Sequence, residues 1–428
     1  MKQYLNPEKS SWATLCQRPV LNNDYLNSTV NNIIQRVKIG GDKALKTLTT
    51  EFDKVEIDSL ELDKKSWQNT ADKLDASLKL AIQHAGANIE KFHAAQQRTF
   101  EKIETTSGVF CWRKAVAIEK VGIYIPGGTA PLFSTVLMLA IPARLAGCKE
   151  IILCSPPDAK GNVNPAIMFA AQLAGVSRAF KVGGAQAIAA MAYGTESIPA
   201  VDKIFGPGNQ YVTKAKQLVN LSGVAIDMPA GPSEVLILCD ETADASFVAA
   251  DLLSQAEHGA DSQVMLLSTN ENKVKAIVNQ VEEQLNKLPR KEFALQALAH
   301  SRAICFDKQA EAVAFSNLYA PEHLIINMKD AEQVAEQIIN AGSVFIGQYT
   351  PESAGDYASG TNHTLPTNGT ARAYSGVSLE SFQKFITFQQ LSEQGIKNLG
   401  NTVMQMAKAE QLEAHSRAVE IRLQKLQS

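Results

Sequence analysis

The stretch Asp251–Gly259, DLLSQAEHG, places several side chains that can bind a metal or transfer a proton within about two turns of a helix. Gln255 and His258 are three residues apart, so on a helix their side chains lie on one face, as the ligands of a single ion must. Glu257 points away from that pair, although sequence spacing alone does not choose Gln255 over Glu257 as a ligand. The alternative is a solvated helix end with ordinary polar residues. A site here therefore needs partners from elsewhere in the chain.

A second reactive pair, Glu322 and His323, lies in the motif APEHL directly before an expected strand. Adjacent acid and imidazole groups suit two separate proton transfers, one by each side chain. A simple turn between a helix and a strand explains the same residues, and we favour the functional interpretation.

Further candidate ligands lie in the C-terminal part of the chain. Asp356 and His363 belong to a loop, residues 351–369, that is rich in Gly, Ser, Thr and Asn, and loops of this length are usually functional. The alternative for Asp356 is an Asx turn, and His415, on the last expected helix, is by default a packed or surface residue. An N2O2 set that suits zinc results when four candidates are read together: Gln255, His258, Asp356 and His415.

Three glycine loops each lie between an expected strand and an expected helix: PGG at 126–128, GGAQ at 183–186 and GPGN at 206–209. In such loops backbone N–H groups approach a phosphate closely, and the helix dipole favours the anion. None matches GxGxxG or the GK[ST] of a P-loop, and tight turns explain any one of them. Three such loops on the same edge of one sheet favour a nucleotide-binding cleft.

The order of the expected elements predicts an α/β protein that positions these residues. Residues 1–115 read as amphipathic helices and form a helical N-terminal region. From residue 116, short β-branched runs alternate with helices, the pattern of parallel βαβ units. We therefore expect two Rossmann-like parallel-sheet domains in series, residues 116–232 with the glycine loops and residues 233–350 with catalytic and zinc-binding residues. Residues 351–428 form a loop and a helical tail that we expect to complete a dimer and its active site.

The expected strands of the first domain are Val121–Ile125, Glu150–Cys154, Ala179–Val182, Lys203–Phe205 and Val224–Asp227. Those of the second domain are Val235–Cys239, Val264–Ser268, Ala303–Phe306, Leu324–Asn327 and Val344–Ile346. The helix that carries Gln255 is expected to begin with Thr242 or Asp244 as its cap and to end at Gly259. After a short mixed segment, the tail is expected to form one or two amphipathic helices over Leu391–Leu426.

Composition excludes several classes of protein. A chain of 428 residues with 45% hydrophobic and 20% charged residues has the make-up of a globular protein of two or three domains. A net charge of −3 argues against nucleic acid as a partner, and no apolar run is long enough to cross a membrane. The N-terminus lacks the apolar core of a signal peptide, and the six cysteines contain no CxxC pair. We therefore expect a cytoplasmic protein with reduced thiols.

Several longer motifs follow one another along the chain: VGIYIPGGTAPLFSTVLM, VGGAQAIAA, VDKIFGPGN, DMPAGPSEV, DLLSQAEHG, APEHL and SAGDYASGTNHTLPT. Together they closely resemble the histidinol dehydrogenase family. The likeness spans nearly the whole chain, from about Asn31 to the last helix.

The resemblance implies a homodimer with shared active sites that oxidises L-histidinol to L-histidine with two NAD and a water. It implies one zinc ion per subunit, held by Gln255, His258, Asp356 and the partner subunit's His415. The residues that would contact NAD are Tyr124, Gln186 and Asn209. The residues that would contact substrate, besides the zinc ligands, are Ser233, His323, His363 and Glu410.

In the reaction of that family, His323 is the expected general base, because a neutral imidazole accepts a proton near neutral pH. Glu322 is expected to activate the water that hydrates the aldehyde, and His323 then takes a proton from the hydrate. The main alternative is a zinc hydrolase, in which Glu322 activates a metal-bound water and the glycine loops only make turns. A second alternative is a non-catalytic protein that keeps the fold for binding.

Overall fold

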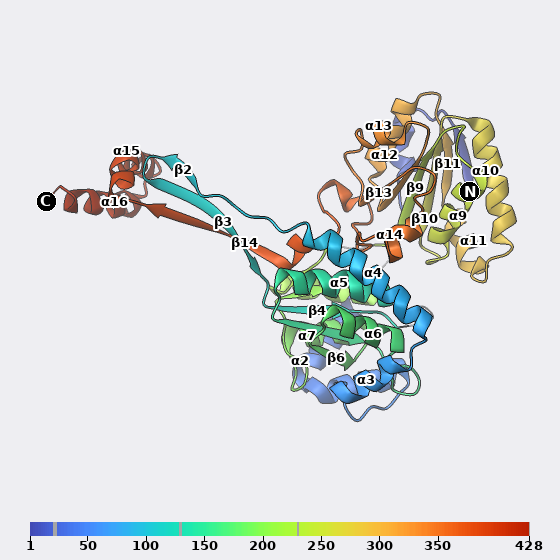
Figure 1. The fold of residues 1–428 in the computed structure, drawn as a ribbon, viewed down its shortest axis with the longest axis horizontal. Helices are drawn as coiled ribbons and strands as arrows, with labels where there is room; N and C mark the ends of the chain where they lie inside the picture. Colours follow the sequence, from blue (N-terminus) through green and yellow to red (C-terminus); the bar gives the residue numbers. More distant parts are fainter. Residues whose placement is uncertain (20–23, 128–130, 229–230, 428) are drawn as a thin grey trace.

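The structure, a computed structural model, describes residues 1–19, 24–127, 131–228 and 231–427. Two α/β domains lie next to each other, and a long arm extends from the first of them (Figure 1). Within the described ranges, no helix combines the length and the apolar character needed to span a membrane. The cysteines are free thiols.

The first domain is built on a parallel sheet whose central strands are buried on both faces. Its strand order is β6 (Arg178–Lys181), β5 (Glu150–Ser155), β4 (Lys120–Tyr124), β7 (Lys203–Phe205) and β8 (Ala225–Ile226). The helices that follow its strands are α5 (Phe133–Ala146), α6 (Pro165–Ala174), α7 (Gly184–Tyr193) and α8 (Gln210–Leu221). Continuous apolar runs such as Ile151–Cys154 are expected where helices cover both faces of a parallel sheet.

The second domain repeats this strand order around a second parallel sheet. The order is β1 (Lys2–Leu5), β11 (Arg302–Cys305), β10 (Gln263–Ser268), β9 (Glu234–Cys239), β12 (His323–Asn327) and β13 (Ser343–Ile346). Its helices are α1 (Lys9–Leu15), α9 (Ala245–Ala256), α10 (Glu271–Leu285), α11 (Lys291–Ala299), α12 (Gln309–Tyr319), α13 (Ala331–Ala335) and α14 (Glu352–Tyr357). In such sheets, ligands bind beyond the carboxyl ends of the strands, where the strand order reverses. The reversal lies at β4 and β7 in the first domain and at β9 and β12 in the second.

All ten strands expected for the two domains occur within a few residues of their expected bounds. The expectation of a purely helical N-terminal region was wrong, because β1 adds an edge strand beside β11. The remaining helices of this region are α2 (Asp24–Asp53), α3 (Lys64–Asp72) and α4 (Ala76–Ala94), and they pack on the helices of the first domain. Their apolar faces need a partner to be buried, so the region divides between the two domains instead of forming a layer of its own.

The arm consists of an antiparallel sheet and two terminal helices. The sheet joins β14 (Gln383–Leu391), β3 (Val109–Ala117) and β2 (Ile103–Thr106), and the helices are α15 (Glu393–Ala409) and α16 (Glu413–Lys425). The two helices were expected, but the strands were not. Strands β3 and β14 lie far apart in sequence and are stabilised by cross-strand pairs such as the stacked Trp112 and Phe388 rings.

Candidate active site

Helix α9 carries Gln255 in its last turn. Asp244 caps the helix by accepting hydrogen bonds from the N–H groups of Ser246 and Phe247, so Asp244, and not Thr242, is the cap. The helix ends at Ala256, earlier than the Gly259 end that we expected. His258 therefore lies in the turn after the helix, where its N–H donates to the Gln255 carbonyl at 3.2 Å.

The Gln255 side chain is fully buried, yet neither its amide oxygen nor its amide nitrogen has a hydrogen-bond partner in the described chain. Buried polar atoms without partners are costly and usually signal a ligand, a water or an ion. Glu257, by contrast, caps the C-terminus of α9 through its backbone and takes no part in the carboxylate cluster described next.

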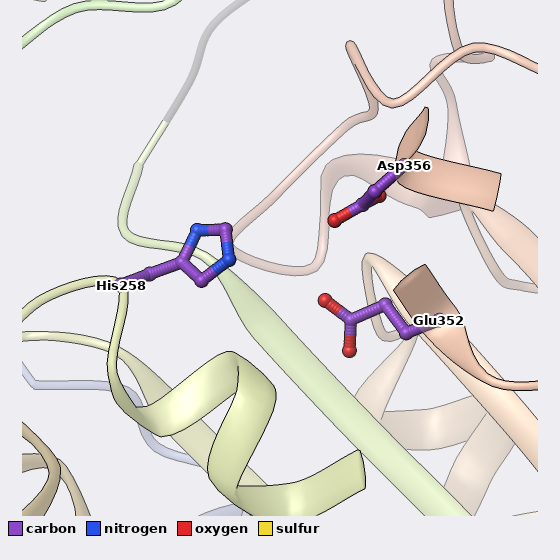
Figure 2. Close-up of side chains that lie close together, drawn as sticks. All are labelled: His258, Glu352 and Asp356. Atoms are coloured by element: carbon purple, nitrogen blue, oxygen red, sulfur yellow. The ribbon is translucent and has the colours of Figure 1, made fainter. Parts of the chain in front are cut away.

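His258, Glu352 and Asp356 form a cluster whose potential ligand atoms lie within 4.8 Å of one another. Figure 2 shows the imidazole and the two carboxylates pointing into a common space. Glu352 and Asp356 are four residues apart on α14, so the helix places both on one face. The sequence reasoning missed Glu352, although a helical reading of PESAGDY would have found it beside Asp356.

His323, the first residue of β12, lies beside the two carboxylates of this cluster. Its Nδ1 donates to the Glu234 carbonyl at 3.1 Å, which leaves Nε2 without a hydrogen bond and 3.5 Å from Oδ1 of Asp356. Burial opposes the charged imidazolium, but the charges of Glu352, Glu322 and Asp356 raise the pKa of His323 well above its usual value.

Glu322 is held directly beside that imidazole. Its Oε2 accepts a hydrogen bond from the Glu234 N–H at 2.8 Å and lies 3.6 Å from Nδ1 of His323. Burial raises the pKa of Glu322 to about 8 and that of Glu352 also to about 8. The backbone of Glu234, at the start of the neighbouring β9, therefore positions both members of the APEHL pair.

His363 connects this cluster to the first domain. Its Nδ1 donates to the Asp356 carbonyl at 2.9 Å, and its Nε2 accepts from the Thr135 hydroxyl of α5 at 2.8 Å. Ser233 directly precedes β9, and its carbonyl accepts from the Gln263 N–H at 3.1 Å. His363 thus contacts the first domain, whereas the contact of Ser233 lies within the second domain.

Glu410 and His415 do not join the cluster within one chain. Glu410 follows the end of α15 and His415 lies in α16, and both are exposed. These helices lie at the far end of the arm, away from α9 and α14 (Figure 1).

A cavity of about 570 Å³, here called the glycine-loop cavity, lies at the carboxyl edge of the first sheet. Tyr124, Gln186 and Asn209, the three expected cofactor contacts, all line it. The Tyr124 hydroxyl accepts from the Gly184 N–H at 3.1 Å. The Asn209 side-chain oxygen caps α8 by accepting from the next helical N–H groups, so its amide nitrogen is the group left to bind a ligand.

The glycines around this cavity also serve close packing. A Cβ at Gly127 or Gly183 would collide with the ring of Pro156, and one at Gly206 would collide with the Tyr124 carbonyl. Gly128, in the first glycine loop, lies outside the described residues. The tight-turn and the cleft interpretations therefore apply together, because the turns bring three loops close enough to enclose the cavity.

The fold and the site together define a two-domain α/β protein with a nucleotide-sized cavity in the first domain and, in the second domain, a cluster of acids and imidazoles whose members are buried except for the exposed His258. The family model for histidinol dehydrogenase matches residues 16–423. A histidinol dehydrogenase of Bacteroides fragilis (strain YCH46) is 59% identical over 426 residues, which is 100% of each chain. A chloroplastic one of Arabidopsis thaliana is 52% identical over 433 residues, covering 100% of this chain and 92% of the relative.

Among solved structures, the crystal structure of histidinol dehydrogenase from Elizabethkingia anophelis superposes with a TM-score of 0.98 at 56% sequence identity. The superposition covers 100% of this chain and 99% of that one. The chain belongs to the histidinol dehydrogenase family.

Proposed function

We propose that the chain catalyses the NAD-dependent oxidation of L-histidinol to L-histidine through L-histidinaldehyde. The observation that carries the proposal is the buried Glu322–His323 pair, held on one backbone segment beside a cluster suited to a cation. Oxidation of an alcohol to an acid needs a base for the alcohol and a base for water, and this pair supplies both. The free cysteines suit the reducing cytoplasm, where we propose that the protein acts.

The proposed zinc ligands fit the ion chemically. Gln255 offers a buried amide without partners, while His258 and Asp356 offer an imidazole and a carboxylate that converge. Imidazole and carboxylate are strong zinc donors and an amide oxygen is a weak one. Zinc bound here would supply a positive charge that orients the substrate through its imidazole and amino nitrogens.

His323 is the proposed base for the alcohol. Its Nδ1 is fixed by the Glu234 carbonyl, so the free Nε2 is the atom that accepts the proton. Asp356 is both a proposed zinc ligand and one of the carboxylates that raise the pKa of His323, so a cation bound there would oppose that rise.

Glu322 is the proposed base for the hydrating water. It keeps its hydrogen bond to the Glu234 N–H through Oε2, and its other oxygen remains to accept the proton of water. His323 then takes a proton from the hydrate before the second oxidation. Because both residues are nearly fully buried, the reactive amino aldehyde is kept from solvent between the two steps.

The glycine-loop cavity is the proposed NAD site, with contacts from Tyr124, Gln186 and Asn209. NAD supplies the hydride acceptor. We propose that the remaining substrate contacts come from Ser233, His363 and Glu410. For His363 this contact requires exchange of its Thr135 hydrogen bond for one to the substrate.

We propose a homodimer in which the arm of each subunit completes the site of the other. In support, Glu410 and the fourth proposed zinc ligand, His415, lie on the arm. The arm also exposes large apolar side chains that a partner would cover: Ile386, Leu391, Met406, Leu412 and Ile421.

The test is to incubate the purified protein with L-histidinol and NAD and to measure NADH absorbance, histidine and bound metal. We expect two NADH for each histidine formed and about one zinc per subunit. A zinc hydrolase or a non-catalytic binding protein would form no NADH, and either result would overturn the proposal.

A further inference from the structure

The glycine-loop cavity contains a single charge among the described residues that line it, the carboxylate of Asp53. The other described lining residues are neutral, and no lysine or arginine is among them: Thr29, Ile33, Phe52, Tyr124, Pro126, Gly127, Pro156, Pro157, Gly184, Ala185, Gln186, Asn209 and Tyr211. The described part of the cavity lining therefore offers a charged hydrogen-bond acceptor but no cation to bind a phosphate monoester.

Asp53 is not explained by the stability of its own helix. It is the last residue of α2, where the helix dipole disfavours a negative charge. Its Oδ2 is buried and has no hydrogen-bond partner in the described chain. Burial accordingly raises the pKa of Asp53 to about 6. A buried acceptor without a donor, facing a cavity, is the arrangement expected of a group that binds a ligand.

The topology points to the ligand group. In a sheet with this strand order, an acid near the end of the second strand binds the ribose hydroxyls of a bound dinucleotide. Here the second strand is β5, which ends in Ser155 and is followed by Pro156 and Pro157. The next acid, Asp158, accepts hydrogen bonds from the backbone of its own loop. Asp158 is not among the described residues that line the cavity, whereas Asp53 reaches the cavity from α2.

We propose that Asp53 accepts hydrogen bonds from the 2′- and 3′-hydroxyls of the adenosine ribose of NAD and thereby selects NAD over NADP. This inference rests on the proposed NAD site. A 2′-phosphate would remove one of the two donors and bring a negative charge toward the carboxylate. With no lysine or arginine among the described lining residues, nothing in the cavity would compensate for that repulsion.

The test is titration calorimetry of the zinc-loaded dimer with NAD, NADP and 2′-deoxy-NAD, for the unchanged protein, Asp53→Asn and Asp53→Ala. We expect Asp53→Ala to weaken NAD binding by about 10- to 100-fold, the effect of losing a hydrogen bond to a charged group. The NAD affinity of Asp53→Asn should lie between that of the unchanged protein and that of Asp53→Ala. In both Asp53 variants, the affinity for 2′-deoxy-NAD should fall less than the affinity for NAD. The ratio of NADP affinity to NAD affinity should be higher in the variants than in the unchanged protein.

Glu56→Gln is the matched control, since it removes an exposed carboxylate three residues further along and should leave all three affinities unchanged. Equal loss of NAD, NADP and 2′-deoxy-NAD affinity in the Asp53 variants, or no loss, would overturn the role of Asp53 while leaving the proposed function intact. An unchanged protein that binds neither dinucleotide would overturn both.

Discussion

Replacing Glu322 by Gln should separate the two oxidation steps. The amide oxygen of Gln can accept the same hydrogen bond from the Glu234 N–H that Glu322 accepts at 2.8 Å, so the local structure should persist. His323 keeps its Nδ1 hydrogen bond to the Glu234 carbonyl and can still act on the alcohol. What the variant loses is the base that activates water. The first hydride transfer should therefore change little and the second should fall sharply.

The size of the effect depends on pH. A positioned general base contributes about 100- to 10,000-fold, so the second step should fall by that factor where Glu322 is ionised. Because burial raises the pKa of Glu322 to about 8, the base form dominates above pH 8. The difference in second-step rate between the unchanged protein and Glu322→Gln should therefore be smaller at pH 7 than at pH 9.

The assay follows NADH absorbance separately for the two steps. Histidinol with a carbonyl trap reports the first step, and supplied histidinaldehyde reports the second. Glu257→Gln is the control, because this neighbouring acid has no role in the proposed chemistry and its loss should spare both steps. The reasoning is refuted if Glu322→Gln slows both steps equally.

Three further predictions concern stability and assembly. Lys216→Met should lower the free energy of unfolding, measured in urea, by about 3–5 kcal/mol, because it leaves the charge of Asp227 buried without its partner. Lys216 Nζ lies 2.5 Å from Asp227 Oδ1, and the two side chains are 4% and 1% exposed. An unchanged free energy of unfolding would contradict a stabilising role for this buried ion pair. Burial raises the pKa of Asp251 to about 7, so the folded protein retains a proton that the unfolded chain releases near pH 4. The free energy of unfolding of the protein should thus fall as pH rises from about 4 to 7. Asp251→Asn lacks this titration, so its free energy of unfolding should rise relative to that of the unchanged protein over the same range. If the difference between the two proteins is the same at pH 4 and pH 8, the raised pKa of Asp251 is contradicted. Mixing His415→Ala and Glu322→Gln subunits, neither of which should form histidine efficiently alone, should restore up to about a quarter of the histidine-forming activity, since each heterodimer would contain one intact site; no recovery in verified heterodimers would exclude the shared site.

Local sequence patterns were sufficient for much of the scaffold. The ten strands of the two sheets could be predicted because a buried parallel strand is a short apolar run bounded by turn residues. The same patterns placed Glu322 and His323 at the start of β12, and the glycine loops at the ends of β4, β6 and β7. Residue type and spacing also brought out His258 and Asp356, which the structure places in one cluster.

Other features could be found only from contacts between distant parts of the chain. Strand β1 is a short, mostly polar segment that becomes a strand through its pairing with β11, and β14 does so through β3. Glu352 reads as an ordinary acid in a polar loop until α14 places its carboxylate beside His323 and Asp356. Asp53 is likewise one acid at the end of one helix until the packing of α2 brings it to the glycine-loop cavity.

The stretch Asp251–Gly259 shows the same difference between what the sequence indicates and what the structure decides. The sequence showed that Gln255 and His258 share one helix face, but spacing alone did not choose Gln255 over Glu257 as a ligand. The tertiary structure decided that α9 ends between them and that the Gln255 amide is buried without a partner. Periodicity and turn chemistry are local properties of a chain. Burial, the loss of a hydrogen-bond partner and the approach of charges from other elements depend on how the whole chain packs, and these determine what the side chains can do.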